Sequence, residues 1–239
     1  MWVAVWAREI ERRRSISRAH TATHMVHKAI REALGDTATQ AGSENGPGRF
    51  RFDFNAQHAI PWGQLQEIEA RVNAVLLDDL PVSAEVMTQD QAREIGAMAL
   101  FGEKYGEVVR MVEIGDGEFS RELCGGTHVR TTSEIGLFRI VSAGSSAANV
   151  RRIEAITGPE AVTLMREHDE LLRAAAAALR TQPERVPEAV APLRARAKPA
   201  GRGGAHGPGG VDAAELAEGA LQRPGAQVLT PVVPAAADK

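Results

Sequence analysis

The chain has 239 residues, of which 44% are hydrophobic and 25% are charged, as in an ordinary globular protein. The net charge of −3 excludes general polyanion binding driven by overall charge, but it does not exclude a local basic patch. The single cysteine, Cys124, excludes an intrachain disulfide. No apolar run reaches the roughly 20 residues of a membrane helix, and the N-terminus lacks a signal-peptide pattern. We therefore expect a cytoplasmic protein.

Residues 1–14 form a lead-in to the main domain, with a short apolar run followed by a charged run that ends at Arg14. Two interpretations stay open for this segment. It can be a strand or linker followed by a solvated charged face, or its arginines can contact phosphates.

A helix is expected to begin near Ser17, which is suited to an N-cap, and to end at Gly35. At about 100° per residue, its apolar side chains fill one arc, and three histidines lie on the opposite face. Such a helix would pack its apolar arc on the core and present His20 and His24 to a cleft. We interpret His27, on the same face, as a supporting or merely polar residue.

The segment 49–54 alternates three phenylalanines with charged residues, which predicts a half-buried strand whose rings belong to the core. A second amphipathic helix is expected from Pro61. Further strands are expected at 82–87, 108–114, 136–142 and 149–156, with a short helix at 89–95. This order predicts an α+β domain over residues 15–158, with a mixed or antiparallel sheet and helices on one side.

Residues 159–197 are predicted to form a helical extension, with a helix to about Leu179 that Pro183, Pro187 and Pro192 then interrupt. Residues 198–239 are predicted to be a disordered, low-complexity tail. The segment 199–210 alone holds six glycines and two prolines, a composition that cannot pack a core.

Two pairs of residues stand out by their chemistry: His20 with His24, and Cys124 with His128 in the run CGGTH. Residues four apart on a helix share a face, so the first pair can point two imidazoles at one ion. A thiolate and a third imidazole complete the four N/S ligands that Zn²⁺ takes in tetrahedral geometry. Because the pairs lie far apart in the sequence, the fold must bring them together.

The spacing alone leaves the role of such a zinc ion open between structure and catalysis. The zinc-protease helix carries a glutamate directly after its first histidine, and Thr21 occupies that place here. Peptide hydrolysis by that mechanism is therefore disfavoured. The glycines beside Cys124 would let a ligand approach the backbone closely.

Several segments in order resemble the editing domain of alanyl-tRNA synthetases and of free-standing alanyl-tRNA editing proteins, over roughly residues 10–180. These segments are RSISRAHTATHMVHKAIREALG, QAGS, RFRFDF, GAMALFGEKYG, ELCGGTHV, GLFRIVS and VRRIEAITG. Threonyl-tRNA synthetases have a related domain, but their cysteine motif usually reads CRGPH. The CGGTH motif of this chain therefore places it on the alanyl side.

The resemblance implies that residues 15–158 are a zinc-dependent editing domain that hydrolyses the ester joining serine or glycine to the tRNA for alanine. A pocket sized for alanine cannot strongly reject a smaller residue or one that adds a hydroxyl, so a second hydrolytic site must correct errors. The resemblance also implies that the zinc ligands are His20, His24, Cys124 and His128. Zinc could hold the substrate or polarise a water molecule.

Four more residues match family positions or suit the substrate. By the resemblance, Thr23 and Gln40 belong to the catalytic pocket, where a hydroxyl and an amide could read the seryl hydroxyl and orient water. The alternative is a helix-surface threonine and a loop glutamine. Arg151 and Arg152 could guide the tRNA end, although a solvated strand face explains them equally well.

Departures from the family pattern set further expectations. Ala19 stands where many relatives carry asparagine. No segment resembles the ATP-binding aminoacylation core or the C-terminal dimerising module, so we expect no independent aminoacylation. The alternatives to a deacylase are a ligase fragment that binds tRNA and zinc without activity of its own, and a gene remnant.

Overall fold

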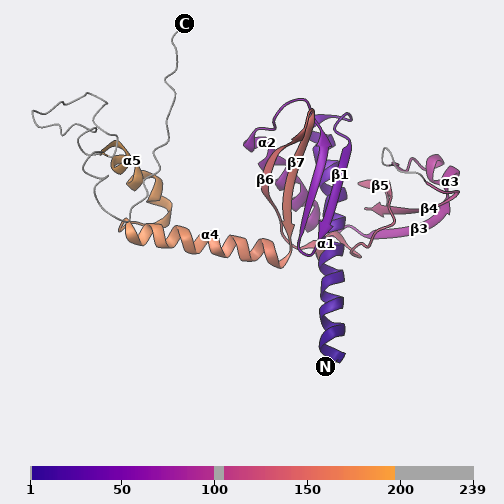
Figure 1. Cartoon of the computed structure of the whole chain (residues 1–239), viewed down its shortest axis with the longest axis horizontal. Coiled ribbons are helices and arrows are strands. Elements are labelled where there is room, and N and C mark those ends of the chain that lie inside the picture. The colour runs from indigo at the N-terminus through magenta and orange to yellow at the C-terminus, as the bar shows by residue number, and fades with distance from the viewer. Residues whose placement is uncertain (1, 100–104, 197–239) are drawn as a thin grey trace, which may run out of the picture.

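The computed structural model describes residues 2–99 and 105–196 of the chain. Two antiparallel sheets lie on either side of the long helix α1, and two further helices lead away from the larger sheet (Figure 1). The elements are α1 (Trp2–Leu34), β1 (Gln40–Gly46), β2 (Arg49–Asn55), α2 (Trp62–Leu77), β3 (Val82–Thr88), α3 (Gln89–Glu94), β4 (Val108–Ile114), β5 (Ser120–Leu123), β6 (Phe138–Ala147), β7 (Val150–Thr157), α4 (Pro159–Ala178) and α5 (Val186–Arg196), with 3-10 turns at Thr132–Ile135 and Pro183–Arg185.

The predicted α+β class is confirmed, but the strands form two sheets where one was expected. The larger sheet has the order β1-β2-β7-β6 and the smaller one the order β3-β4-β5, and all these pairings are antiparallel. Register places Phe52 of β2 opposite Ile153 of β7 in the larger sheet, and Met111 of β4 opposite Leu123 of β5 in the smaller. Each sheet therefore has its own apolar contacts.

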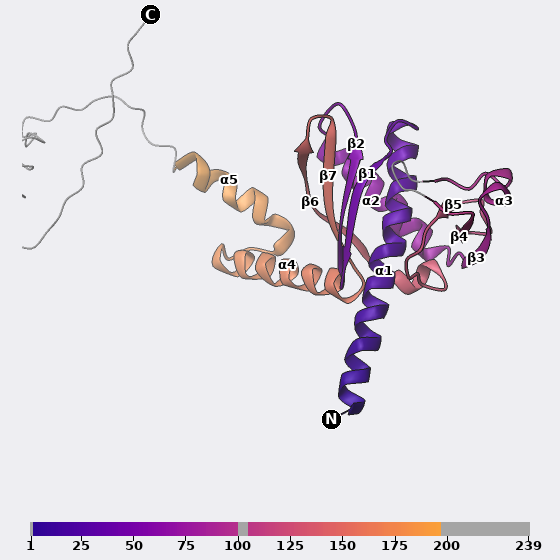
Figure 2. The ribbon, with the colours of Figure 1, turned by 45° about the vertical axis from the view of Figure 1, so that its right-hand side comes forward.

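Helix α1 begins at Trp2, so the prediction of a helix start near Ser17 after a strand or linker was wrong. Residues 2–16 contain no proline or glycine, and their arginines, glutamates and alanines are good helix formers, so a serine alone does not begin a new helix. The first half of α1 extends beyond both sheets (Figures 1 and 2). Residues 8–14 are all exposed, as the solvated-face interpretation expects.

The predicted end of α1 at Gly35 is confirmed, because this residue adopts a φ of +91° that favours glycine. The central core lies between the larger sheet and helices α1 and α2, which cover one of its faces (Figure 2). The apolar arc of α1 and the phenylalanines of β2 belong to it, as predicted, together with five buried residues of α2. Those five are Leu65, Ile68, Val72, Val75 and Leu76. A smaller core holds Ala92, Val109, Met111 and Leu123.

Helix α4 matches the predicted helix over 159–179, whereas the interruption by prolines is confirmed only in part. Pro183 begins a 3-10 turn and Pro187 lies in the first turn of α5, where a proline is tolerated. Pro192 lies inside α5. The predicted disordered tail, 198–239, lies outside the described residues. Among the described helices, none has the length and apolar character to span a bilayer.

Candidate metal centre

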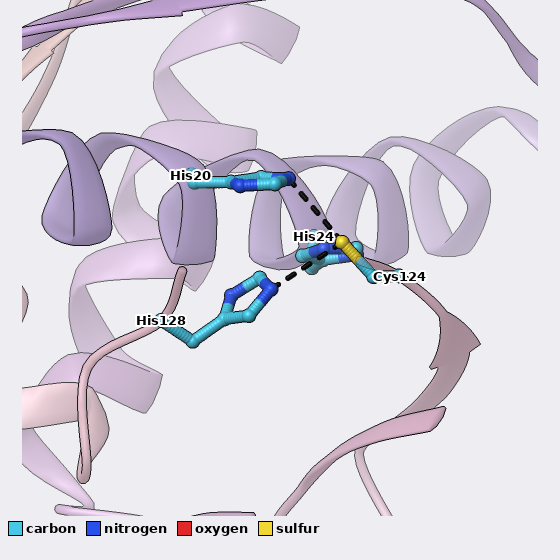
Figure 3. A group of neighbouring side chains, drawn as sticks. All are labelled: His20, His24, Cys124 and His128. Carbon is cyan, nitrogen blue, oxygen red and sulfur yellow. Dashed lines mark hydrogen bonds between the residues drawn. The ribbon is translucent and has the colours of Figure 1, made fainter. Parts of the chain in front are cut away.

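Four side chains from two distant parts of the chain converge at the middle of α1 (Figure 3). The ligand atoms of His20, His24, Cys124 and His128 all lie within 4.8 Å of one another. The Cys124 Sγ atom is 3.4 Å from His20 Nε2 and 3.3 Å from His128 Nε2. Tetrahedral zinc, with its usual bond lengths, separates a sulfur and a nitrogen ligand by roughly 3.6 Å. The residues that spacing selects are therefore brought together at distances that suit this ion.

The surroundings of the His24 ring are those of a metal ligand. Its ring is buried, with its Nδ1 atom 2.9 Å from Glu122 Oε2, while its Nε2 atom is buried without a hydrogen-bond partner among the described residues. A buried ring nitrogen left without a partner needs an explanation, and a metal ion would provide it. Metal-bound histidines usually hold a carboxylate at the other ring nitrogen, as Glu122 does here.

Glu122 is one of the supporting residues of the cluster that sequence reasoning missed. It lies on β5, is 3% exposed, and accepts a hydrogen bond of 2.6 Å from Ser120 through Oε1. Its Oε2 atom is also 3.5 Å from His27 Nδ1, so the prediction that His27 supports the site fits its position. The sequence does not single it out, because β5 is not predicted; once that strand is known, its alternation places Glu122 on the side of Cys124.

The charged groups of the cluster shift the pKa values of their neighbours in the direction opposite to the effect of burial. Burial by itself lowers the pKa of His24, but the Glu122 carboxylate outweighs it and raises that pKa to about 10. Burial raises the pKa of the Cys124 thiol, but hydrogen bonds with His128 and His20 and the positive charge of His24 bring it down to about 3. Burial likewise raises the pKa of Glu122, and His24 holds it well below its usual range. A metal ion would thus meet a ready thiolate and displace a proton from His24.

Thr21 orients the ring of His128. Its hydroxyl donates to the Ser17 carbonyl oxygen at 2.9 Å and accepts from the Val129 amide at 3.2 Å. The Nδ1 atom of His128 lies 3.2 Å from the same hydroxyl oxygen. Because the only hydroxyl proton is directed at Ser17, Nδ1 must be the donor. With a metal ion bound, a proton on Nδ1 would leave the lone pair of Nε2, the atom that faces Cys124, free to coordinate the ion.

Arg110 of β4 holds the backbone of the cysteine loop. Its Nη1 atom donates to the carbonyl oxygens of Cys124 at 2.9 Å and Gly126 at 2.7 Å. The Cys124 amide donates in turn to the Arg110 carbonyl oxygen at 2.9 Å. The His20 ring packs directly on Gly126, where an added Cβ atom would overlap the imidazole. Position 126 therefore requires glycine, because the His20 ring lies too close for a side chain.

Replacing Gly126 by alanine is expected to weaken zinc binding by about 1–3 kcal/mol, the usual cost of an overpacked methyl group. The matched control is Gly125→Ala, because a Cβ atom at Gly125 meets nothing within 4 Å. Zinc affinity measured by competition with a chromophoric chelator checks this. Equal affinities for the two variants would contradict the close contact between Gly126 and His20.

The two residues predicted for the catalytic pocket lie apart from these contacts. Thr23 is 3% exposed, so it is not a helix-surface threonine, and its hydroxyl lies 3.0 Å from Ala19 O and 2.8 Å from Asn45 Oδ1. Gln40 is the first residue of β1, and its amide donates to Ser43 at 3.3 Å. Within residues 2–99 and 105–196, no hydrogen bond joins Thr23 or Gln40 to the four-residue cluster.

Arg151 and Arg152 each have a partner within the fold. Arg152 makes a two-pronged ion pair with Asp53, at 2.7 Å and 2.8 Å. Arg151 donates to the Gln57 carbonyl oxygen at 3.2 Å. As neighbours on β7 they point to opposite faces of the sheet. They therefore do not present one joint surface.

Comparison with known proteins relates part of the chain to a known domain family, and Cys124 and His128 lie in the matched part. Residues 109–154 match the threonyl and alanyl tRNA synthetase second additional domain. An alanine–tRNA ligase of a Nocardioides species is 55% identical over 182 residues, and that of Acidothermus cellulolyticus is 52% identical over 192. The enzyme of Frankia casuarinae is 45% identical over 232 residues.

These alignments cover most of this chain but a small part of the relatives. They include 76%, 80% and 95% of the chain, and 20%, 21% and 26% of the three ligases in the same order. The resemblance predicted from the motifs is thereby confirmed. The chain is thus similar to about a fifth to a quarter of the length of these alanine–tRNA ligases, and it carries a match to the second additional domain of threonyl and alanyl tRNA synthetases.

Proposed function

We propose that the chain hydrolyses the ester of mischarged seryl- or glycyl-tRNA for alanine in the cytoplasm, with a zinc ion at the four-residue cluster. The observation that carries the proposal is the set of four converging ligand atoms, with Glu122 behind His24, in a relative of alanine–tRNA ligases. A synthetic pocket sized for alanine cannot reject serine or glycine well enough by binding alone. A hydrolytic site on the same family of chains supplies the correction.

His20, His24, Cys124 and His128 would hold the ion, which when bound supplies a positive centre for the ester carbonyl. The other proposed roles belong to the chain itself. Thr23 reads the seryl hydroxyl and Gln40 orients water, each after a rearrangement that brings its polar group to the substrate. Hydrogen bonds in catalytic sites often tighten only when substrate is bound.

The second candidate function is tRNA binding with zinc in a purely structural role. The observation that favours it is the number of protein ligands, because four fill the tetrahedral shell and closed shells are typical of structural zinc. Both candidates predict zinc in the protein. They differ in whether the intact chain removes serine from tRNA.

The test is to incubate the purified chain with seryl-tRNA for alanine and to follow loss of the ester. We expect rapid loss with the unaltered chain and only the uncatalysed rate with the double variant His20→Ala, Cys124→Ala. The control is His168→Ala, an exposed histidine on α4 far from the cluster in sequence. Ester loss equal to the uncatalysed rate with a folded, zinc-loaded chain would favour the second candidate. Formation of alanyl-tRNA with consumption of ATP is not expected.

A further inference from the structure

A basic groove runs from the first half of α1 to the metal cluster. It encloses about 800 Å³ between Arg13, Arg14 and Arg18 on the helix and Thr127, His128 and Arg130 on the facing segment. Four arginines and one glutamate line it, so it is strongly positive although the whole chain is slightly acidic. Because His128 belongs both to the groove and to the cluster, an occupant of the groove reaches the metal centre.

The arginines of the groove differ in how they are neutralised. Arg18 pairs with Glu11 at 3.0 Å, and Arg130 is bound by Glu134. Arg13 and Arg14 are exposed and have no carboxylate partner among the described residues. Because no carboxylate of the described chain is bound directly to either guanidinium group, both can attract an anion that enters the groove.

The groove lies where the chain leading to a bound ester would run. Arg13 and Arg14 precede His20 by seven and six residues on the same helix, which is roughly 10 Å along its axis. We propose that this groove binds the phosphodiester backbone of the RNA next to the esterified 3′ end. The inference deepens the proposed function and takes the position of the ester from it.

The chemistry of the groove favours a phosphate backbone over bases. Guanidinium groups bind phosphate oxygens through two parallel hydrogen bonds, which makes arginine suited to this anion. The groove has no phenylalanine, tyrosine or tryptophan among its lining residues, so it lacks the large rings on which bases usually stack. Contacts to phosphate position an RNA without reading its sequence. Binding here should therefore depend on salt and little on the bases.

The test uses the full chain and a synthetic RNA hairpin that copies the acceptor arm. The hairpin carries no amino acid, so no hydrolysis is needed. The double variant Arg13→Gln, Arg14→Gln is expected to weaken binding about tenfold at low salt. It should also reduce the slope of log affinity against log salt by about 1 to 2. The matched control is Arg8→Gln, Arg12→Gln, which removes the same charge from exposed positions of α1 outside the groove lining. The control pair should change the affinity by less than about twofold.

A second arm identifies the RNA group. Uncharged methylphosphonate linkages at the 3′ end should weaken binding to the unaltered chain by a similar factor. Combined with Arg13→Gln, Arg14→Gln they should add little, because both changes remove the same contacts. Independent effects, an equal loss in the control pair, or no binding by the unaltered chain would overturn the proposal. If the binding results are as expected but the chain leaves seryl-tRNA intact, the proposal for the groove stands and the proposed hydrolysis is contradicted.

Discussion

Replacing Glu122 by glutamine is expected to lower the zinc affinity of the chain by about 10- to 100-fold, the usual effect of losing a carboxylate behind a metal-bound histidine. In the structure this carboxylate lies 2.9 Å from His24 Nδ1 and 3.5 Å from His27 Nδ1, and all three groups are buried. Glutamine has nearly the same shape but carries no charge. The ring of His24 would therefore be less basic and less firmly oriented toward the ion.

Competition with a chromophoric chelator measures this affinity, and circular dichroism confirms that the variant is folded. The matched control is Glu85→Gln, which removes an exposed carboxylate from β3 of the same sheet. Glu122→Asp keeps the charge but shortens the side chain, so its zinc affinity should lie between those of Glu122→Gln and Glu85→Gln. An unchanged affinity in Glu122→Gln would show that this carboxylate does not act through His24.

Much of the fold could be predicted because its elements carry their periodicity in the sequence. The alternation of β2 and the apolar spacing of α2 each reflect one buried face. The missed strands lack that signal, because β1 reads QAGSENG and β5 has four residues. The division into two sheets also could not be predicted, since strand partners depend on tertiary contacts. The wrongly predicted beginning of α1 has another cause. Ser17 suits an N-cap, but no residue before it breaks the helix.

The candidate site likewise has residues that the sequence predicts and residues that it does not. The four ligand residues could be selected from spacing and residue type, because metal chemistry restricts both. The supporting residues could not be selected so directly. Thr21 acts through a hydroxyl whose proton is directed at Ser17, and Arg110 acts through carbonyl oxygens of a loop from another strand. Such roles depend on neighbours that only the folded chain brings together.

Replacing Phe52 by alanine is expected to destabilise the metal-free chain by about 3–5 kcal/mol, the usual cost of emptying a buried aromatic site. Phe52 is completely buried, with its ring 6.0 Å from that of Phe54 and 5.6 Å from that of His27. His27 in turn lies beside Glu122, so the cavity would also loosen the support behind the metal cluster. Urea denaturation with zinc removed by a chelator measures the loss as a lower midpoint at an unchanged slope.

The control is Trp62→Ala, a large aromatic residue that is 52% exposed at the start of α2 and should cost no more than about 0.5 kcal/mol. Repeating the denaturation with zinc tests the connection between core and cluster. If Phe52 supports His27 and Glu122, zinc should stabilise the Phe52→Ala chain less than the unaltered one, because its affinity for the folded state is lower. Equal stabilisation of both chains by zinc would show that the core and the cluster are independent.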